Sequence, residues 1–483
     1  MSRTKITVAH GDGIGPEVMQ VCLDVFRATN VPLDFDEVPM GKSVALAGEA
    51  TGISPEARAS VEATGILFKG PMETPKGGGY KSVNVTARKL WGAFANKRVY
   101  HVLPGVRAPL GERKLDLTMI RENIEDTYGA VEHMQTHDVA QCRRFITRPG
   151  SEQVHRYTFE VAARKGAHRV TCAHKANIMK MTDGLFLETF YEVAKEYPQL
   201  QADDIMIDAL AMKLVLEPEA FDVIVLPNLQ GDILTDLAAG LVGGLAYAPS
   251  ANIGDNVCIF EAVHGTAPDI VGLDLANPTA LLLSGTMLLR HVGLVGHAEA
   301  IEAALERTLV ALHADGQGAS FRTSAFRARI LEELRGVSVD GSAERPLLLP
   351  RTEPRMRVSP APSSTELMGV DVFLESGLAP GSVAAALENV QPELPLRMIS
   401  NRGTQVWPTG SAYTDCVNHY RVRFESETPV AQSALVALLD AVGERFPLCG
   451  AEWLRRIDGR RAYSLAQGQG QAQALEVAVA SLA

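Results

Sequence analysis

Short apolar runs alternate with longer helical patterns through roughly the first 335 residues of this chain. The runs that predict strands are residues 6–9, 66–68, 117–120, 169–172, 205–208 and 223–226. A helical pattern over residues 17–29 follows the first of them. Strands that alternate with helices are typical of α/β domains, so we expect an α/β architecture for this part of the chain.

The chain changes character after residue 336. Residues 337–365 are rich in Pro and Ser, which predicts an extended linker. Beyond it, strand patterns occur at 369–375, 396–400, 405–407, 418–425 and 460–465, and helical patterns at 382–390 and 431–446. This order predicts a small α+β domain of the β-α-β-β-α-β type over residues 366–483, with a frayed tail at 467–474.

The composition argues against several classes of protein. The net charge of -11 disfavours non-specific binding to nucleic acid. No apolar run approaches the roughly 18 residues of a membrane span, and a strand pattern begins almost at once, so we expect no targeting segment and a cytoplasmic protein. The six scattered cysteines lack the spacing of a metal site and are expected to be free thiols.

Asp232 and Asp236 lie four residues apart, just after the strand pattern at 223–226. An apolar helical pattern follows them, so both carboxylates are expected on one face of a helix's first turn. Two adjacent hard oxygen anions suit a divalent cation such as Mg²⁺ or Mn²⁺. The alternative is that these acids only interact favourably with the helix dipole.

Three arginines, Arg88, Arg98 and Arg121, occur in the first quarter of the chain. Arginine is the side chain best suited to hold a carboxylate with two hydrogen bonds, so three of them predict a small polyanionic substrate. The alternative is three unrelated surface arginines with solvated guanidinium groups.

Tyr128, Lys175 and Asp208 add groups that can transfer protons or bind metal. Tyr128 closes a segment with a buried pattern and can donate a proton. Lys175 follows the strand pattern at 169–172, and a lysine beside a metal site can act in proton transfer. Asp208 is predicted to end a strand and to add a third carboxylate. The alternative for Lys175 is an ordinary exposed lysine.

Six motifs occur in order over residues 5–335 and together carry a resemblance. They are Gly11-Asp-Gly-Ile-Gly-Pro16, Ser82-Val-Asn-Val-Thr-Ala-Arg88, Arg121-Glu-Asn-Ile-Glu-Asp-Thr-Tyr128, His174-Lys-Ala-Asn177, Asn228-Leu-Gln-Gly-Asp232-Ile-Leu-Thr-Asp236 and His264-Gly-Thr-Ala-Pro268. The chain resembles the β-decarboxylating dehydrogenase family, and within it the isocitrate dehydrogenases. The resemblance implies a two-domain α/β/α core. Residues 1–93 and 243–336 would form a large coenzyme domain, and residues 94–242 a small domain with a dimer clasp and the metal site.

The resemblance also implies roles for individual residues. The substrate would contact Thr74, Ser82, Asn84, Arg88, Arg98, Arg121 and Asn177. Asp208, Asp232 and Asp236 would bind Mg²⁺ or Mn²⁺, and Tyr128 with Lys175 would transfer protons. In this family the counterparts of Lys175 and Asp208 come from the neighbouring subunit, so we expect a homodimer with shared active sites.

The implied reaction is oxidative decarboxylation of isocitrate to 2-oxoglutarate and CO₂. Ser82 and Asn84 form a polar pair that suits the third carboxylate of isocitrate, whereas 3-isopropylmalate needs apolar contacts there. Homoisocitrate and 3-isopropylmalate stay open as alternative substrates. A scaffold that kept the fold and lost catalysis is a further alternative, but none of the expected site residues is missing.

The Gly11 motif lacks the G-x-G-x-x-G spacing of a Rossmann loop. The resemblance implies that the coenzyme lies instead along the loop from His264 to Asn277. The implied contacts are Thr74, His264, Gly265, Thr266, Ala267, Asp269, Ile270 and Asn277. NADP-using relatives have Lys and Tyr where Asp269 and Ile270 stand. Asp269 would accept a hydrogen bond from the ribose and repel a 2′-phosphate. Ala276 is also associated with NAD, and residues 316–324 show no evident match to the Tyr and Arg that hold the phosphate. The predicted coenzyme is therefore NAD.

The C-terminal domain resembles the extension of Thermus-type members of the family, and we interpret it as an assembly or regulatory module, through which a higher oligomer could form. RNA binding is disfavoured, because the domain is nearly neutral and lacks an RNP-like aromatic motif. The segment Asn401-Arg402-Gly403 predicts either a ligand-sensing loop or a tight turn that only positions strands, and we favour the turn.

Overall fold

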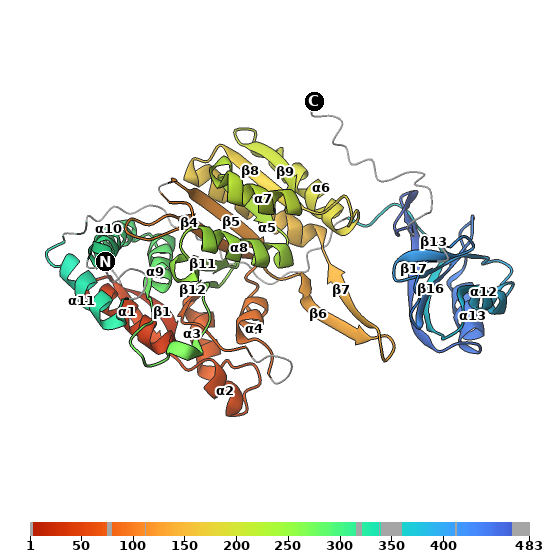
Figure 1. Ribbon diagram of the computed structural model, residues 1–483, viewed down its shortest axis with the longest axis horizontal. Coiled ribbons are helices and arrows are strands. Elements are labelled where there is room, and N and C mark those ends of the chain that lie inside the picture. Colours follow the sequence, from red (N-terminus) through yellow and green to blue (C-terminus); the bar gives the residue numbers. More distant parts are fainter. Residues whose placement is uncertain are drawn as a thin grey trace. The chain divides into compact units, whose positions relative to one another are not determined.

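The computed structural model describes residues 3–74, 80–111, 113–314, 321–337, 339, 360–410 and 413–465. The chain divides into two compact units (Figure 1). The first unit comprises Met1–Gly129 and Phe145–Arg357, and the second comprises Ala130–Arg144 and Val358–Ala483. Most of the predicted linker and the tail at 467–474 lie outside the described residues. The division of the first unit into a large and a small domain stays a prediction.

A ten-stranded sheet forms the centre of the first unit, in the order β2-β1-β3-β12-β11-β4-β5-β10-β8-β9. Its strands are β1 (Thr4–Ala9), β2 (Leu33–Glu37), β3 (Ile66–Lys69), β4 (Ala95–His101), β5 (Asp116–Glu122), β8 (Arg169–His174), β9 (Gln201–Met206), β10 (Val223–Leu226), β11 (Pro249–Ile253) and β12 (Cys258–Ala262). The outer strands pair in parallel, while β12, β11, β4 and β5 pair antiparallel at the centre.

Helices cover both faces of this sheet. They are α1 (Gly15–Ala28), α2 (Lys42–Leu46), α3 (Pro55–Thr64), α4 (Val83–Leu90), α5 (Arg148–Lys165), α6 (Thr182–Ala194), α7 (Ile207–Leu216), α8 (Asn228–Leu241), α9 (Thr279–His291), α10 (Val295–Ala314) and α11 (Thr323–Glu333), with short 3₁₀ turns η1 (Pro218–Ala220), η2 (Leu245–Tyr247) and η3 (Pro268–Ile270). In β10, Val223 and Val225 join the core with α5 and α6, whereas Ile224 and Leu226 pack with α7 and α8. This alternation follows from the two-residue period of a strand and confirms the predicted α/β/α fold.

Two local predictions in this unit were wrong. The strand expected at 205–208 ends at Met206, so Asp208 lies in the first turn of α7. Helix α8 begins at Asn228, which places Asp232 and Asp236 after its first turn instead of in it. All six cysteines are free, as predicted. None of the described helices is long and apolar enough to cross a membrane.

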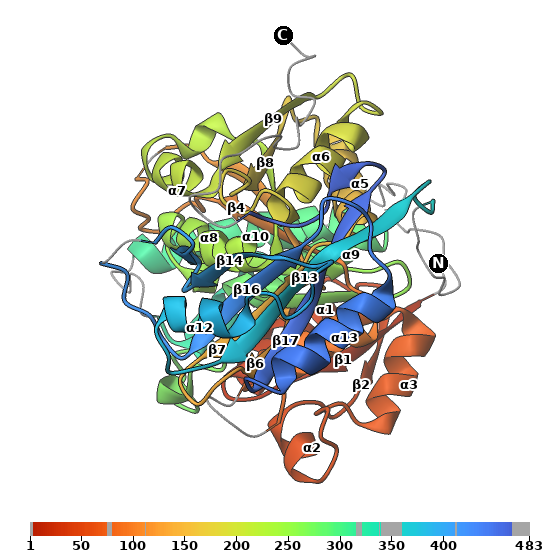
Figure 2. The same cartoon turned by 90° about the vertical axis from the view of Figure 1, so that its right-hand side faces the viewer.

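The second unit is an antiparallel sheet with helices on one face (Figure 2). Its strands are β13 (Thr365–Glu375), β14 (Leu396–Asn401), β15 (Thr404–Trp407), β16 (His419–Glu425), β17 (Leu448–Ile457) and β18 (Arg460–Arg461), in the order β15-β14-β16-β13-β17-β18. Helices α12 (Pro380–Leu387) and α13 (Gln432–Gly443) pack on alternate residues of β13 and β16, such as Val370 and Val422. This confirms the predicted α+β domain.

The last strand of this domain was predicted in the wrong place. The main strand is β17, which pairs with β13 along most of its length, and residues 460–461 only extend the sheet edge. Charged Glu452, Arg455 and Arg456 interrupt the apolar pattern of β17, so its sequence does not show the alternation of a strand.

A hairpin of β6 (Asp126–Met134) and β7 (Ala140–Phe145) contributes its residues Ala130–Arg144 to the second unit. The Thr136 hydroxyl donates to Asn418 Oδ1 at 3.0 Å, and Arg143 Nη2 lies 3.1 Å from Glu452 Oε1. Strand β6 thus carries Tyr128 at one end and enters the second unit at the other.

Candidate active site

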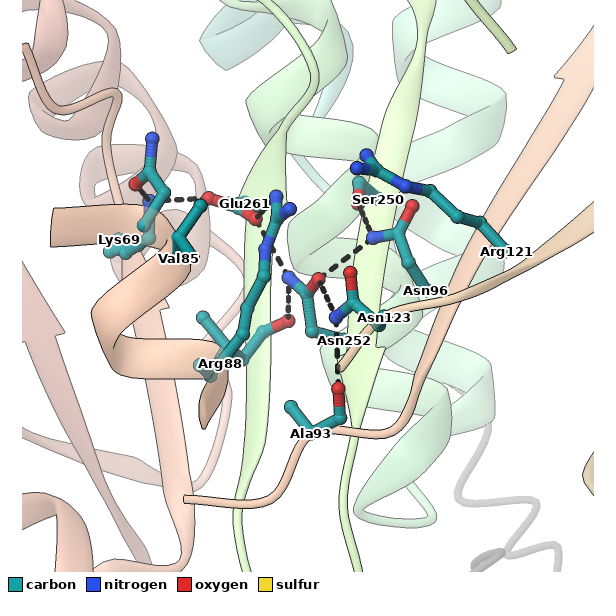
Figure 3. Close-up of polar contacts among 12 residues, drawn as sticks. Lys69, Val85, Arg88, Ala93, Asn96, Arg121, Asn123, Ser250, Asn252 and Glu261 are labelled. Carbon is teal, nitrogen blue, oxygen red and sulfur yellow. Dashed lines mark hydrogen bonds and ion pairs between the residues drawn. The ribbon is translucent and has the colours of Figure 1, made fainter. Parts of the chain in front are cut away.

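The register of the central strands brings polar side chains from four strands together. Asn252 of β11 lies opposite Asn96 of β4, and Asn96 lies opposite Arg121 of β5. Ser250 lies opposite Arg98 in the same way, and on its other side opposite Glu261 of β12. Polar side chains at these positions therefore form rows across the middle of the sheet, as Figure 3 shows.

Arg121 is the most completely buried of the predicted site residues, with 1% of its surface exposed. Its Nε and Nη2 donate to Asn228 at the start of α8, and its Nη1 pairs with Asp232. The guanidinium also lies over the ring of Tyr128, 4.8 Å from the centroid. Burial lowers the pKa of Arg121 to about 10, so the group stays charged near neutral pH.

Tyr128 and Asp232 form a hydrogen bond of 2.5 Å from the phenol Oη to the carboxylate Oδ2. Burial, and then this bond, raise the pKa of Tyr128, so the phenol keeps its proton near neutral pH. Burial favours the protonated carboxyl of Asp232, but the charge of Arg121, the hydrogen bond from Tyr128 and the charges of the other two arginines together outweigh it, so the pKa of Asp232 is lowered. The pair can therefore present a protonated phenol beside an ionised carboxylate.

Arg98 links the acids to the sheet. Its Nη1 donates to Thr235 Oγ1 at 2.5 Å and to Asp236 Oδ1 at 3.3 Å, and its Nε donates to Asn96 Oδ1 at 2.8 Å. Asp232 and Asp236 are one turn apart on α8, as predicted, and the Asp236 side chain is 57% exposed. Two accessible hard carboxylates fit a divalent cation, so the side chains present are suited to the predicted metal.

Lys69 and Arg88 share one buried carboxylate, Glu261 (Figure 3). Lys69 Nζ pairs with Glu261 Oε2 and donates to Asn84 Oδ1 at 2.8 Å, while Arg88 Nη2 lies 2.9 Å from Glu261 Oε1. Burial raises the pKa of Glu261, but the two cations outweigh it and hold this pKa well below its usual range. Asn84 and Arg88, both on α4, are thus held in place from the ends of β3 and β12.

An amide network ties this carboxylate to the rest of the sheet (Figure 3). Asn252 Nδ2 donates to Glu261 Oε1 at 2.7 Å. Its Oδ1 accepts from Asn96 Nδ2 at 2.9 Å and from Asn123 Nδ2 at 3.0 Å. The chain of bonds from Arg98 to Arg88 therefore runs through Asn96 of β4, Asn252 of β11 and Glu261 of β12, and each of these side chains is oriented by a hydrogen-bonded neighbour.

Lys175 and Asp208 form a separate pair, with Nζ 2.5 Å from Oδ1. The described residues of one chain contain no group of three or more His, Cys, Asp or Glu that could hold a metal ion. Asp208 therefore does not join Asp232 and Asp236 within a single chain. Asn177, two residues after Lys175, is exposed.

The Gly11 motif meets the predicted coenzyme loop. Ile14 N donates to Thr266 O at 3.1 Å, and Asp12 N donates to Pro71 O at 2.7 Å. A Cβ on Gly13 would lie 2.2 Å from Thr266 O, so only glycine allows this approach. The Gly11 motif therefore packs against both the loop after β3 and the predicted coenzyme loop.

The loop itself has one polar group without a partner. His264 Nε2 is buried and makes no hydrogen bond in the described part of the chain, which leaves it available to a bound coenzyme. Asp269 lies exposed in η3, and Asn277 Oδ1 accepts from Thr279 N at the start of α9. Thr74 donates to Ser82, which caps α4.

Sequence reasoning missed several residues of this site. They are Lys69, Asn96, Asn123, Ser250, Asn252 and Glu261. For Asn96, Ser250, Asn252 and Glu261 a weak signal was available: polar residues are mixed with apolar ones in the strands at 95–101, 249–253 and 258–262. Such a polar residue in a buried strand must find a partner, so it marks either a site or a network.

The comparisons with known proteins agree with this geometry. A family model described as isocitrate/isopropylmalate dehydrogenase matches residues 5–323. A second, described as bacterial isocitrate dehydrogenase, C-terminal domain, matches residues 365–469. A crystal structure of a protein from Thermus thermophilus superposes with a TM-score of 0.90 at 42% identity, covering 97% of both chains.

Curated relatives span the same length. The chain is 43% identical to a Thermus thermophilus protein named isocitrate dehydrogenase (NADP), over 97% of this chain and 96% of that one. It is 36% identical to the Rickettsia felis protein of the same name, over 96% and 99%. It is 44% identical to subunit 2 of the mitochondrial isocitrate dehydrogenase (NAD) of Schizosaccharomyces pombe, over 63% and 80%. The chain therefore belongs to the isocitrate/isopropylmalate dehydrogenase family.

Proposed function

We propose that the protein catalyses the NAD-dependent oxidative decarboxylation of isocitrate to 2-oxoglutarate and CO₂. The observation that carries the proposal is the meeting of arginines and acids on neighbouring elements. Arg98 and Arg121 both contact Asp232 of α8, and Tyr128 donates to the same carboxylate. A site with this much positive charge around a metal-binding pair suits a substrate with several carboxylates.

The substrate would be held through its carboxylates. Arg88, Arg98 and Arg121 supply three guanidinium groups, and Lys69 fixes the Asn84 amide beside Arg88. Ser82 and Asn84 begin α4 and offer polar contacts to a third carboxylate, which favours isocitrate over 3-isopropylmalate. Asn177 would add a polar contact from the partner subunit.

Tyr128 and Lys175 would transfer the protons in the proposed reaction. Tyr128 keeps its proton and can give it to the substrate carbon after CO₂ leaves, and Lys175 can take the proton of the substrate hydroxyl. Bound NAD would accept the hydride from the hydroxyl carbon. A divalent cation on Asp208, Asp232 and Asp236 would stabilise the negative charge that develops on the substrate oxygen.

The site would be complete only in a homodimer. Lys175 and Asp208 pair with each other within one chain, away from Asp232 and Asp236. Helices α7 and α8 pack together and expose apolar side chains, namely Met212, Val215, Leu216, Leu229 and Ile233. Large apolar side chains gathered in this way favour a subunit interface, which would deliver Asp208 to the partner's acids.

The choice of NAD rests on Asp269 and Ile270. An exposed carboxylate can accept a hydrogen bond from the ribose and repels a 2′-phosphate. The named full-length relatives point the other way, because both are called NADP enzymes. Residues 315–320, where part of the phosphate grip was sought, lie outside the described residues.

The test of activity is steady-state absorbance at 340 nm with isocitrate and Mn²⁺, using NAD and NADP in parallel. We expect turnover with isocitrate, and little with homoisocitrate or 3-isopropylmalate. No turnover with any of the three acids would contradict the proposed reaction and favour a non-catalytic scaffold.

The coenzyme is tested by kcat/KM for NAD and for NADP. We expect NAD to be preferred, and Asp269→Lys with Ile270→Tyr to shift the ratio toward NADP by tenfold or more, since each charge-assisted hydrogen bond is worth roughly 1.5–3 kcal/mol. Glu299→Lys, an exposed charge reversal on α10, controls for net charge. A wild-type preference for NADP would overturn the NAD assignment and leave the proposed reaction standing.

A further inference from the structure

The second unit contains a cavity of about 530 Å³ on the sheet face opposite α12 and α13. Four charged side chains and one histidine line it: Asp371, Arg402, Arg421, Glu452 and His419. Ser400, Phe373, Trp453, Tyr463 and Ser464 also line it. Its size is that of a site for a small molecule.

Both carboxylates of this cavity already have arginine partners. Asp371 is shared by two guanidinium groups: Arg421 Nη2 lies 2.6 Å from Oδ2, and Arg423 Nε lies 2.7 Å from Oδ1. Glu452 pairs with Arg143 of β7 at 3.1 Å. Arg402 lies within ion-pair distance of no carboxylate in the described part of the chain. The cavity and its immediate surroundings therefore carry excess positive charge.

Two buried nitrogen atoms beside the cavity lack partners. Arg423 is fully buried behind Asp371, and its Nη1 makes no hydrogen bond within the described residues. His419 Nε2 is also buried and unpaired there, and His419 lines the cavity. Both residues lie on the same face of β16 as Arg421, because each is two positions away from it along the strand. Buried polar groups normally have partners, so these nitrogens mark a place where a ligand or an ordered water would bond.

The Asn401-Arg402-Gly403 turn supplies the cavity's rim. Asn401 Nδ2 donates to Val417 O at 2.8 Å, and Val417 N donates to Asn401 Oδ1 at 3.0 Å, so Asn401 anchors the turn. Arg402 has a φ of 51° and Gly403 a φ of 81°, as a tight turn between β14 and β15 requires. The favoured turn therefore accounts for Asn401 and Gly403, but not for the choice of arginine at 402.

We propose that this cavity binds a small anion through a phosphate or carboxylate group, held by Arg402 and Arg421. Arginine is well suited to both groups because its fork of donors matches their oxygens. The two sources of such an anion, phosphate compounds and carboxylic acids, differ in charge and shape and can be tested separately. The site is distinct from the residues proposed for catalysis, so the proposal stands whether or not the proposed reaction is correct.

The experiment is calorimetric titration of the full-length protein with inorganic phosphate in one arm and glutarate in the other, without metal or coenzyme. We expect at least one probe to bind, and Arg402→Glu to weaken that binding by about tenfold or more, because a charge-assisted bond becomes a repulsion. Arg402→Lys should retain most of the affinity. Arg445→Glu, an exposed charge reversal on the same unit away from the cavity, is the matched control.

Each outcome either supports or overturns the anion site. Binding of phosphate alone, or of glutarate alone, that depends on Arg402 supports the site and identifies the class of ligand. Binding that Arg402→Glu and Arg445→Glu leave equal belongs to another site and overturns the proposal, as does no binding of either probe to wild type. Arg402 is exposed, so we expect both variants to fold, and circular dichroism with unchanged dehydrogenase turnover checks this.

Discussion

Two buried carboxylates, Glu261 in the first unit and Asp371 in the second, are each shared by two cations. Glu261 binds Lys69 and Arg88, and Asp371 binds Arg421 and Arg423. Each cluster keeps one positive charge in excess, and each leaves one buried guanidinium nitrogen unbonded among the described residues, Arg88 Nε and Arg423 Nη1. A carboxylate that positions two cations neutralises only one of them. The net positive charge that is left can attract an anion.

The two clusters differ in what fixes the carboxylate. Glu261 also accepts from Asn252, which accepts in turn from Asn96 and Asn123 on β4 and after β5. Asp371 is held only by its arginines among the contacts that the described residues show, and Ser464 O accepts from Arg423 beside it at 2.8 Å. Glu261 therefore bonds side chains from two neighbouring strands and a helix, whereas Asp371 bonds side chains from one strand, β16.

This difference suits two kinds of site. Catalysis requires side chains held to within a fraction of an ångström, and a bonded network across a sheet provides that. Binding alone tolerates more adjustment, and a guanidinium such as Arg421, whose side chain is 20% exposed, can turn toward a ligand. The same charge arrangement thus supports the proposed chemistry in one unit and the proposed anion site in the other.

The largest expected difference between the two units is in catalysis. Asp236→Asn removes a charge that would hold the metal, and we expect kcat to fall by on the order of a thousandfold at saturating Mn²⁺. Asp371→Asn should leave kcat within about twofold, because Asp371 touches no proposed catalytic residue. Steady-state kinetics measures both, and an Asp236→Asn enzyme within tenfold of wild type would refute the metal assignment.

Stability should show the next largest difference. Glu261→Gln leaves Lys69 and Arg88 buried without their carboxylate, and we expect the free energy of unfolding to fall by about 3–5 kcal/mol. Asp371→Asn should cost less, about 1–3 kcal/mol, because Arg421 can reach solvent. Urea unfolding followed by circular dichroism measures both changes.

The control is to remove the stranded charge as well. Lys69→Met in the Glu261→Gln background eliminates the buried ammonium group, so it should regain part of the lost stability. If the double variant is less stable than Glu261→Gln, charge repulsion is not the cause. Equal losses for Glu261→Gln and Asp371→Asn would remove the contrast between a fixed and an adjustable carboxylate.

The sequence predicted those parts of the fold that depend on local pattern. Strands β1, β3, β5, β8 and β10 have apolar runs, and each lies where its run predicted it. Strand β17 was missed because Gly450, Glu452, Arg455 and Arg456 interrupt its apolar residues, so its pattern resembles a loop. Asp208 was placed on a strand because residues 205–208 are apolar up to that aspartate, although the helix α7 begins at Ile207.

The candidate site was predictable only where a motif carried it. Arg121, Tyr128 and Asp232 lie in recognisable motifs, and the structure brings these three together. Lys69, Asn252 and Glu261 meet because β12 pairs with both β3 and β11, a pairing that no local pattern specifies. Their roles therefore depend on the register of the sheet, which has to be seen in three dimensions.

The smallest expected effect concerns the ion pair of Arg143 with Glu452, which joins the β6–β7 hairpin to the wall of the anion cavity. Both side chains are about half exposed, so Arg143→Ala should change stability by less than about 1 kcal/mol. It also frees a carboxylate at the cavity, and we expect the binding of phosphate or glutarate to weaken by about two- to fivefold. Glu452→Gln should strengthen binding by a similar factor, because it removes negative charge from the wall. Calorimetric titration of the two variants measures both affinities. Affinities that change in opposite directions sharpen the contrast between the two units. Affinities that change in the same direction would show that the ion pair acts through structure and not through charge.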